Sequence, residues 1–241
     1  MGELLVPNSI RAVNITLGHA ATTTHLPTVL LTLRIDLDYV PWDAPDAEAF
    51  GHGEPAMILR LLDFARTTGL KLHFFISARS LRAFPATVDA ILGEAHDLDW
   101  LAKHAEDPER YKESATLFGL AGHKPIGIAL KTPWSADLKP EWVSGFQFLS
   151  APPGPCPQPL THFSLGTRPL VEAIRAGVSM RSWTDEIKCA VARAEEQTTI
   201  VVRPQVLSKT DPQLKQLKEI VDFATANSIA IRTMRDLVKG H

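Results

Sequence analysis

The chain has 241 residues and a formal net charge of -2; 45% of the residues are hydrophobic and 22% are charged, as in an ordinary globular protein. Lysine and arginine form no basic run. We therefore expect no nucleic acid as a partner. No apolar stretch reaches the roughly 18 residues that span a membrane, so we expect no membrane partner either. The first residues lack the pattern of a signal peptide. Cys156 and Cys189 show no C-x-x-C spacing, so we expect a cytoplasmic protein with two free thiols.

Strands and helices are expected to alternate along the chain, after an N-terminal arm over residues 1–28 with weak periodicity. Apolar, β-branched segments predict strands over 29–36, 70–77, 96–100, 125–130, 198–202 and 229–232. Amphipathic or capped segments predict helices from Pro55 to Gly69, over 85–92, from Asp107 onward, and over 169–176, 182–194 and 211–226. In the helix at 182–194, Ser182 and Asp185 have the spacing of a capping box.

This alternation predicts parallel βαβ units. Right-handed crossovers close such units into a barrel or leave an open doubly wound sheet. We find neither a linker nor an internal repeat between residues 29 and 241, and therefore expect one α/β domain over this range. The segment 132–164 is rich in proline and turn residues, with short apolar pieces at Trp142 and at 146–149.

The first predicted strand ends in Ile35-Asp36-Leu37-Asp38. Side chains two residues apart lie on the same side of a strand, and ligands of parallel α/β folds bind at the carboxyl ends of the strands. Two carboxylates this close favour a nearby cation, which suits a general base beside a metal ligand. The alternative is that both are solvated loop acids or helix caps.

Other candidate residues follow later strands. Trp42 suits stacking on a sugar, or alternatively anchors a loop. The segment from His96 to His104 holds two histidines and two aspartates, which are usual donors to a divalent metal, but their spacing of eight aims at most one histidine into a site. Lys131 follows the strand at 125–130 and is suited to stabilising an oxyanion. Arg203 follows the strand at 198–202.

Neither a P-loop, nor G-x-G-x-x-G, nor G-x-S-x-G is found. The ordered elements instead resemble the polysaccharide deacetylase family of metal-dependent (β/α) barrels, which hydrolyse N-acetyl and related C–N bonds. Over about residues 29–238, the resemblance rests on these matches: Asp36 and Asp38 resemble its first-motif acids, Leu72-His-Phe-Phe-Ile-Ser77 its T-F-F strand, Glu94-Ala-His96-Asp-Leu the lead into its histidine motif, Lys131-Thr-Pro133 its R-x-P, and Val202-Arg203-Pro204-Gln its late L-H motif.

The chain departs from that family at the metal ligands, so the resemblance is to a divergent carbohydrate-esterase-type deacetylase barrel. The H-x-x-x-H histidines are expected at Leu101 and Ala105, and His104 is one residue out of register. Lys131 replaces the family's arginine, and Arg203 replaces its late histidine. Losing a donor and adding a fixed positive charge both weaken a metal site, so we expect zinc or a similar divalent metal to be held weakly or not at all.

The leading hypothesis is a hydrolase of non-peptide C–N bonds with a degenerate metal site, acting on a small-molecule or carbohydrate substrate. The resemblance implies Asp36 as general base, Asp38 as metal ligand with His104 as a second donor, and Lys131 at the oxyanion. The residues expected to bind substrate are Trp42, His96, Trp134 and Arg203. The rival hypothesis is a non-catalytic sugar- or acid-binding member of the same fold, and a third keeps catalysis without metal, through Asp36 and a histidine. The sequence does not indicate the oligomeric state.

Overall fold

The computed structural model describes residues 29–39, 54–102, 108–135, 141–194 and 196–239. Its centre is an eight-stranded sheet in the order β6-β5-β4-β3-β2-β1-β7, with β8 paired to β1. Every pairing is parallel. The strands are β1 (Leu30–Leu37), β2 (His73–Ile76), β3 (Asp97–Leu101), β4 (Gly127–Ala129), β5 (Phe148–Ala151), β6 (Thr161–Ser164), β7 (Gln197–Val202) and β8 (Ala230–Ile231).

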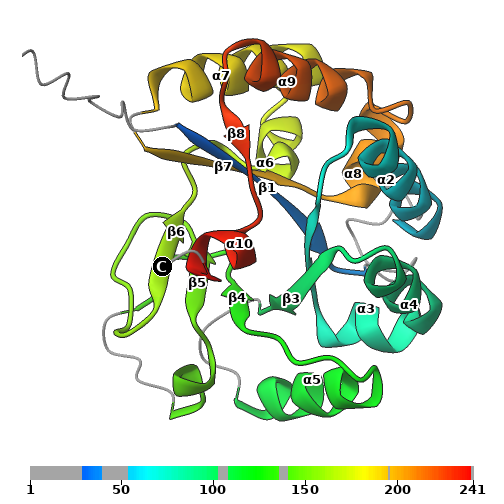
Figure 1. Cartoon of the computed structure of the whole chain (residues 1–241), viewed down its shortest axis with the longest axis vertical. Helices are drawn as coiled ribbons and strands as arrows, with labels where there is room; N and C mark the ends of the chain where they lie inside the picture. The colour runs from blue at the N-terminus through cyan, green and yellow to red at the C-terminus, as the bar shows by residue number, and fades with distance from the viewer. Residues whose placement is uncertain (1–28, 40–53, 103–107, 136–140, 195, 240–241) are drawn as a thin grey trace, which may run out of the picture.

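Helices surround this curved sheet (Figure 1). They are α2 (Glu54–Thr68), α3 (Ala78–Ala83), α4 (Pro85–Gly93), α5 (Pro108–Leu120), α6 (Leu170–Arg175), α7 (Met180–Arg193), α8 (Pro204–Thr210), α9 (Lys215–Ala226) and α10 (Met234–Lys239), with a 3-10 helix η1 (Glu141–Gly145). The fold is the predicted one: parallel strands curl into a (β/α) barrel of the deacetylase type. Within the described ranges, no helix is both long and apolar enough to cross a membrane.

The first strand shows how the sequence builds both faces of the sheet. Side chains alternate along a strand, so the leucines and isoleucine at 31, 33, 35 and 37 join the large apolar core. The alternate residues Thr32, Arg34, Asp36 and Asp38 face the barrel interior, where each is at most 4% exposed. Strands that are buried on both faces are usually apolar throughout. In β1, by contrast, every second residue is polar, so this strand brings polar side chains into the barrel interior.

The barrel interior is layered. A slab of apolar side chains fills its middle: Phe75, Leu101, Ala129, Phe148, Phe163 and Met234. Polar side chains lie at both ends of this slab. Arg34 connects one polar layer to the slab, because its guanidinium lies 5.6 Å from the centroid of the Phe75 ring.

Several element boundaries differ from the sequence predictions. The cap of α7 is Ser179, whose side chain accepts from the backbone N–H of Ser182, so the predicted capping box at Ser182 and Asp185 is wrong. The helix predicted from Asp211 begins at Lys215, because the Asp211 carboxylate caps it from outside by accepting from Lys215, Gln216 and Leu217. Gly69 does end α2, with a φ of 67° that glycine adopts without strain.

Six short elements were not predicted: α3, η1, β5, β6, α8 and α10. Each spans four to seven residues, too few for a clear hydrophobic period. The predicted arm over 1–28 lies outside the described residues. Cys156 and Cys189 are free thiols, as predicted.

Candidate functional site

The interior face of β1 places a buried ion pair under the rim of the barrel. Arg34 Nε donates to Asp36 Oδ1 over 2.7 Å, and Arg34 Nη2 donates to Asp36 Oδ2 over 2.9 Å. The same guanidinium donates to the carbonyl oxygens of Leu130 and Ser150, beyond β4 and on β5. Asp36 is 3% exposed and both of its oxygens accept from Arg34, so it is held as a structural carboxylate across the barrel.

Asp38 is surrounded by cationic side chains from the carboxyl ends of two other strands. Lys131, which follows β4, forms an ion pair with Asp38 Oδ2. Arg203, which follows β7, has its Nη2 3.7 Å from the same oxygen and donates to the backbone oxygen of Asp38 over 2.9 Å. Parallel strands end at one rim, which explains how three residues distant in sequence meet there.

The first residue of α2 brings a further carboxyl group to this rim. Glu54 Oε2 accepts from Gln205 Nε2 over 2.6 Å, and that same amide nitrogen donates to the Asp38 backbone oxygen over 2.9 Å. Glu54 and Gln205 are each 2% exposed. Among the described residues, no basic side chain forms an ion pair with Glu54.

Burial without an ion pair keeps Glu54 protonated near neutral pH. Desolvation raises the pKa of Glu54 to about 8; Arg203 opposes this rise, and the negative charge of Asp38 adds to it. Burial also lowers the pKa of Lys131, an effect that Asp38 opposes and Arg203 reinforces. Perturbed groups gathered at one strand-end rim are typical of a functional site.

Within the described part of the chain, three buried side-chain atoms of this rim have no hydrogen-bond partner: Glu54 Oε1, Gln205 Oε1 and Arg203 Nε. Buried polar atoms in folded proteins are nearly always satisfied by protein, water or ligand. Their concentration at one place marks the rim as a candidate site for a polar ligand.

The described residues do not fit a zinc ion. Zinc in a catalytic site takes three protein ligands, usually histidine and carboxylate. Asp38 is instead engaged by Lys131 with Arg203 beside it, and Leu101, at a position where the resemblance implies a histidine, packs in the apolar slab. In the part of the chain that the structure describes, no group of three or more histidine, cysteine, aspartate or glutamate side chains could hold a metal.

The remaining predicted site residues do not gather here. His96 precedes β3 at the end of the sheet opposite to Asp36, and its Nδ1 accepts from the Leu72 backbone N–H. Trp134 is 3% exposed and packs in the large apolar core, where it has no face for a sugar. The structure does not bring His96 into the group formed by Asp38, Lys131 and Arg203, and the substrate-binding roles of His96 and Trp134 stay predictions. Trp42 and His104 lie outside the described residues, so their roles stay predictions.

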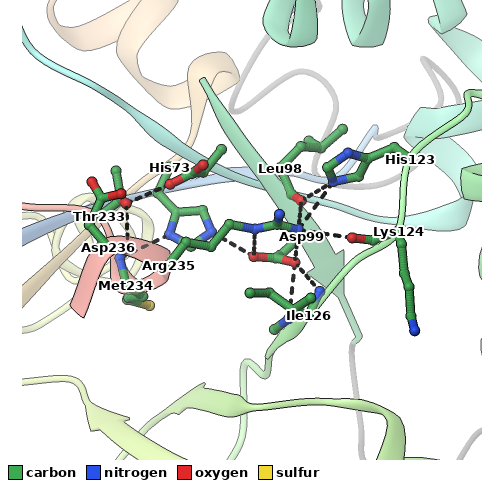
Figure 2. Close-up of polar contacts among 12 residues, drawn as sticks. His73, Leu98, Asp99, His123, Lys124, Ile126, Thr233, Met234, Arg235 and Asp236 are labelled. Atoms are coloured by element: carbon green, nitrogen blue, oxygen red, sulfur yellow. Dashed lines mark hydrogen bonds and ion pairs between the residues drawn. The ribbon is translucent and has the colours of Figure 1, made fainter. Parts of the chain in front are cut away.

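The aspartates near His96 belong to a separate polar cluster at the amino end of the barrel. Figure 2 shows the Asp99 carboxylate bonded to Arg235, with His73 beside it. The Nδ1 atom of His73 accepts from the Met234 backbone N–H, so Nε2 carries the proton that is donated to Asp99. Thr233 donates to Asp97 in the same way. These bonds attach α10 to the starts of β2 and β3, which is a stabilising role.

Sequence reasoning missed Arg34, Glu54 and Gln205. Arg34 stands on the same face as Asp36 and Asp38, at the spacing of two that pointed to those acids. Glu54 has the sequence context of an ordinary acid in the first turn of a helix, where it complements the helix dipole. Its burial is a tertiary property that this local pattern does not contain.

Comparisons with solved structures find the same fold. An allantoinase has a TM-score of 0.63 at 12% identity, covering 90% of this chain and 91% of that chain. A peptidoglycan deacetylase mutant from Bacillus subtilis has a TM-score of 0.55 at 13% identity, covering 89% and 92%. A CE4 family pseudoenzyme from Bacillus anthracis has a TM-score of 0.60 at 10% identity, covering 89% of this chain and 66% of that chain; a mutant of it with restored enzymatic activity matches with the same score. No family model and no curated protein sequence matches the chain.

Proposed function

We propose that this chain, whose fold is that of the polysaccharide deacetylases, binds a carbohydrate or small-molecule ligand at the Asp38 rim and does not act as a zinc-dependent hydrolase. The observation that carries the proposal is the ion pair between Lys131 and Asp38, with the Arg203 guanidinium 3.7 Å from the same carboxylate oxygen. A metal-binding carboxylate would have to leave this lysine and accept a dication beside a permanent positive charge. In this arrangement the two side chains supply the positive charge that a zinc ion would supply.

The state of Asp36 also favours binding over catalysis. A general base needs a free oxygen aimed at the attacking water. Both oxygens of Asp36 accept charge-assisted hydrogen bonds from Arg34, and the residue is only 3% exposed, so its carboxylate is directed at Arg34 rather than at solvent. The fold also occurs in a protein described as a pseudoenzyme, so it does not require activity.

A second candidate function is metal-independent hydrolysis of a non-peptide C–N bond. Glu54 favours it, because a carboxyl group with a pKa of about 8 holds a proton at neutral pH and would donate it to a leaving nitrogen. Lys131 would then face the developing oxyanion. We rank this candidate second because it needs Asp36 as the general base, and both oxygens of Asp36 are bound by Arg34.

The deciding experiment incubates the chelator-treated chain with N-acetylglucosamine oligomers and allantoin, and monitors released acetate and ring opening in parallel with binding by isothermal titration calorimetry. We expect binding of a sugar or acid without turnover. Turnover that appears only with added zinc would contradict the proposal. Turnover without metal, abolished by Glu54→Gln and unaffected by the exposed-site change Glu186→Gln, would establish the second candidate.

The predicted compartment forms part of the proposal. Cys156 and Cys189 are free, which suits a reducing cytoplasm. Labelling both thiols in intact cells with a membrane-permeant reagent, but not with an impermeant one, is the expected outcome. Oxidised thiols in freshly lysed cells would contradict it.

A further inference from the structure

We infer that the ligand of this rim carries a carboxylate, and that Arg203 and Lys131 hold it. The inference rests on the proposed function and names the chemical class of its ligand. An acidic sugar, with a carboxylate on a polyhydroxylated ring, combines this class with the carbohydrate ligand that the fold suggests.

The charges of the site favour one extra negative charge. The rim and the layer below it hold three basic side chains, Arg34, Lys131 and Arg203, which pair with two acidic ones, Asp36 and Asp38. Glu54 has no ion-pair partner among the described residues, and the neutral form of a carboxyl is the one that burial favours. Among the described residues of this cluster, basic side chains therefore outnumber paired acidic ones by one, and a monoanion would balance that excess. A dianion such as a phosphate monoester would leave net negative charge there.

The donors are suited to a carboxylate. A guanidinium has five N–H donors in a planar fork that matches the two oxygens of a carboxylate. Arg203 Nη2 donates to the backbone oxygen of Asp38, while its buried Nε has no partner in the part of the chain that the structure describes. Lys131 has three donors, and its side chain is 31% exposed, so the lysine is partly accessible from solvent.

Groups that suit ring hydroxyls lie next to these donors. Glu54 Oε1 and Gln205 Oε1 are buried and have no hydrogen-bond partner among the described residues. A protonated Glu54 Oε1 donates, whereas the Gln205 amide oxygen accepts, so a hydroxyl group can satisfy both. Uncharged polar partners of this kind, beside one guanidinium, distinguish an acidic sugar from a simple fatty acid.

The test measures binding of D-glucuronate and of its neutral isostere D-glucuronamide to the full chain by calorimetry at low ionic strength. We expect glucuronate to bind about tenfold to a hundredfold more tightly than glucuronamide. The reason is that each charge-assisted hydrogen bond from Arg203 or Lys131 strengthens binding by up to about tenfold relative to a neutral one. Arg203→Gln and Lys131→Met should remove most of this preference, whereas the exposed-site controls Arg193→Gln and Lys215→Met should preserve it.

The two ligands need no variant, so the comparison stands even if Arg203→Gln fails to fold. Equal binding of glucuronate and glucuronamide would overturn the carboxylate inference and leave the proposed function intact. Failure of the unmodified chain to bind glucuronate, glucuronamide or N-acetylglucosamine at roughly millimolar concentration would overturn both. A preference for glucuronate that survives both Arg203→Gln and Lys131→Met would place the anion elsewhere and contradict the inference.

Discussion

Replacing Glu54 with glutamine should stabilise the protein at neutral pH. In the unfolded chain the Glu54 carboxyl has a pKa near its ordinary value of 4.5, whereas burial raises the pKa in the folded chain to about 8. Between these values the folded state binds more protons than the unfolded state, so stability falls as pH rises through this window. Each pH unit between 4.5 and 7 costs about 1.4 kcal/mol, or about 3 kcal/mol in total at pH 7.

Glutamine keeps the shape of the neutral carboxyl and still accepts the hydrogen bond from Gln205, but it has no charge to desolvate. Glu54→Gln should therefore raise the free energy of unfolding by about 3 kcal/mol at pH 7, or the melting temperature by about 6 to 12 °C in a chain of this size. At pH 5 the gain should fall below about 1 kcal/mol, since the unfolded carboxyl is then partly protonated.

The assay is urea denaturation followed by tryptophan fluorescence at both pH values, with Glu186→Gln on the exposed face of α7 as the matched control. The control should change stability by less than about 0.5 kcal/mol. A loss of stability in Glu54→Gln at pH 7, or an equal gain at pH 5 and pH 7, would refute the protonated state assigned to Glu54.

Three further predictions concern other parts of the barrel. Asp36→Asn should lower stability by about 3–5 kcal/mol, because Arg34 loses its buried partner, and urea denaturation that detects a loss under about 1 kcal/mol would contradict this. Arg235→Met should lower stability by a similar amount, because it leaves the buried Asp99 carboxylate without its cationic partner. The exposed-site change Arg232→Met should be nearly neutral. Arg203→His should strengthen zinc binding in calorimetry, since it removes a fixed charge and adds a donor; unchanged affinity would mean that Arg203 does not control the metal.

The strand ends were predictable from sequence because their signals are local. Apolar, β-branched residues before Asp36 predict a buried strand, and a parallel fold places strand ends at one rim. That reasoning placed Asp38, Lys131 and Arg203 in one site, where the structure joins them. It could not distinguish the two ends of the short strand near His96, since the strand begins one residue after the histidine.

Pairing inside the barrel was not predictable from the sequence. The sequence does not distinguish an aspartate whose two oxygens are bound by a guanidinium from an aspartate that faces water. The assignment of Asp36 as a base came from a motif, whereas the contacts of Arg34 with Leu130 and Ser150, which help to fix its guanidinium against Asp36, depend on how distant strands lie across the barrel. Glu54 was missed for the same reason, because only the packing of α2 against α8 and the rim removes it from water.

Metal content tests the central claim, that Lys131 and Arg203 supply the positive charge at Asp38 in place of a zinc ion. The chain should be purified without chelator or added metal, and analysed by inductively coupled plasma mass spectrometry. We expect well under about 0.1 equivalent of zinc per chain, because two cations at the carboxylate oppose a third. One equivalent of zinc that survives dialysis against a chelator would contradict the account, and would require that ligands from outside the described residues, such as His104, displace Lys131 from Asp38.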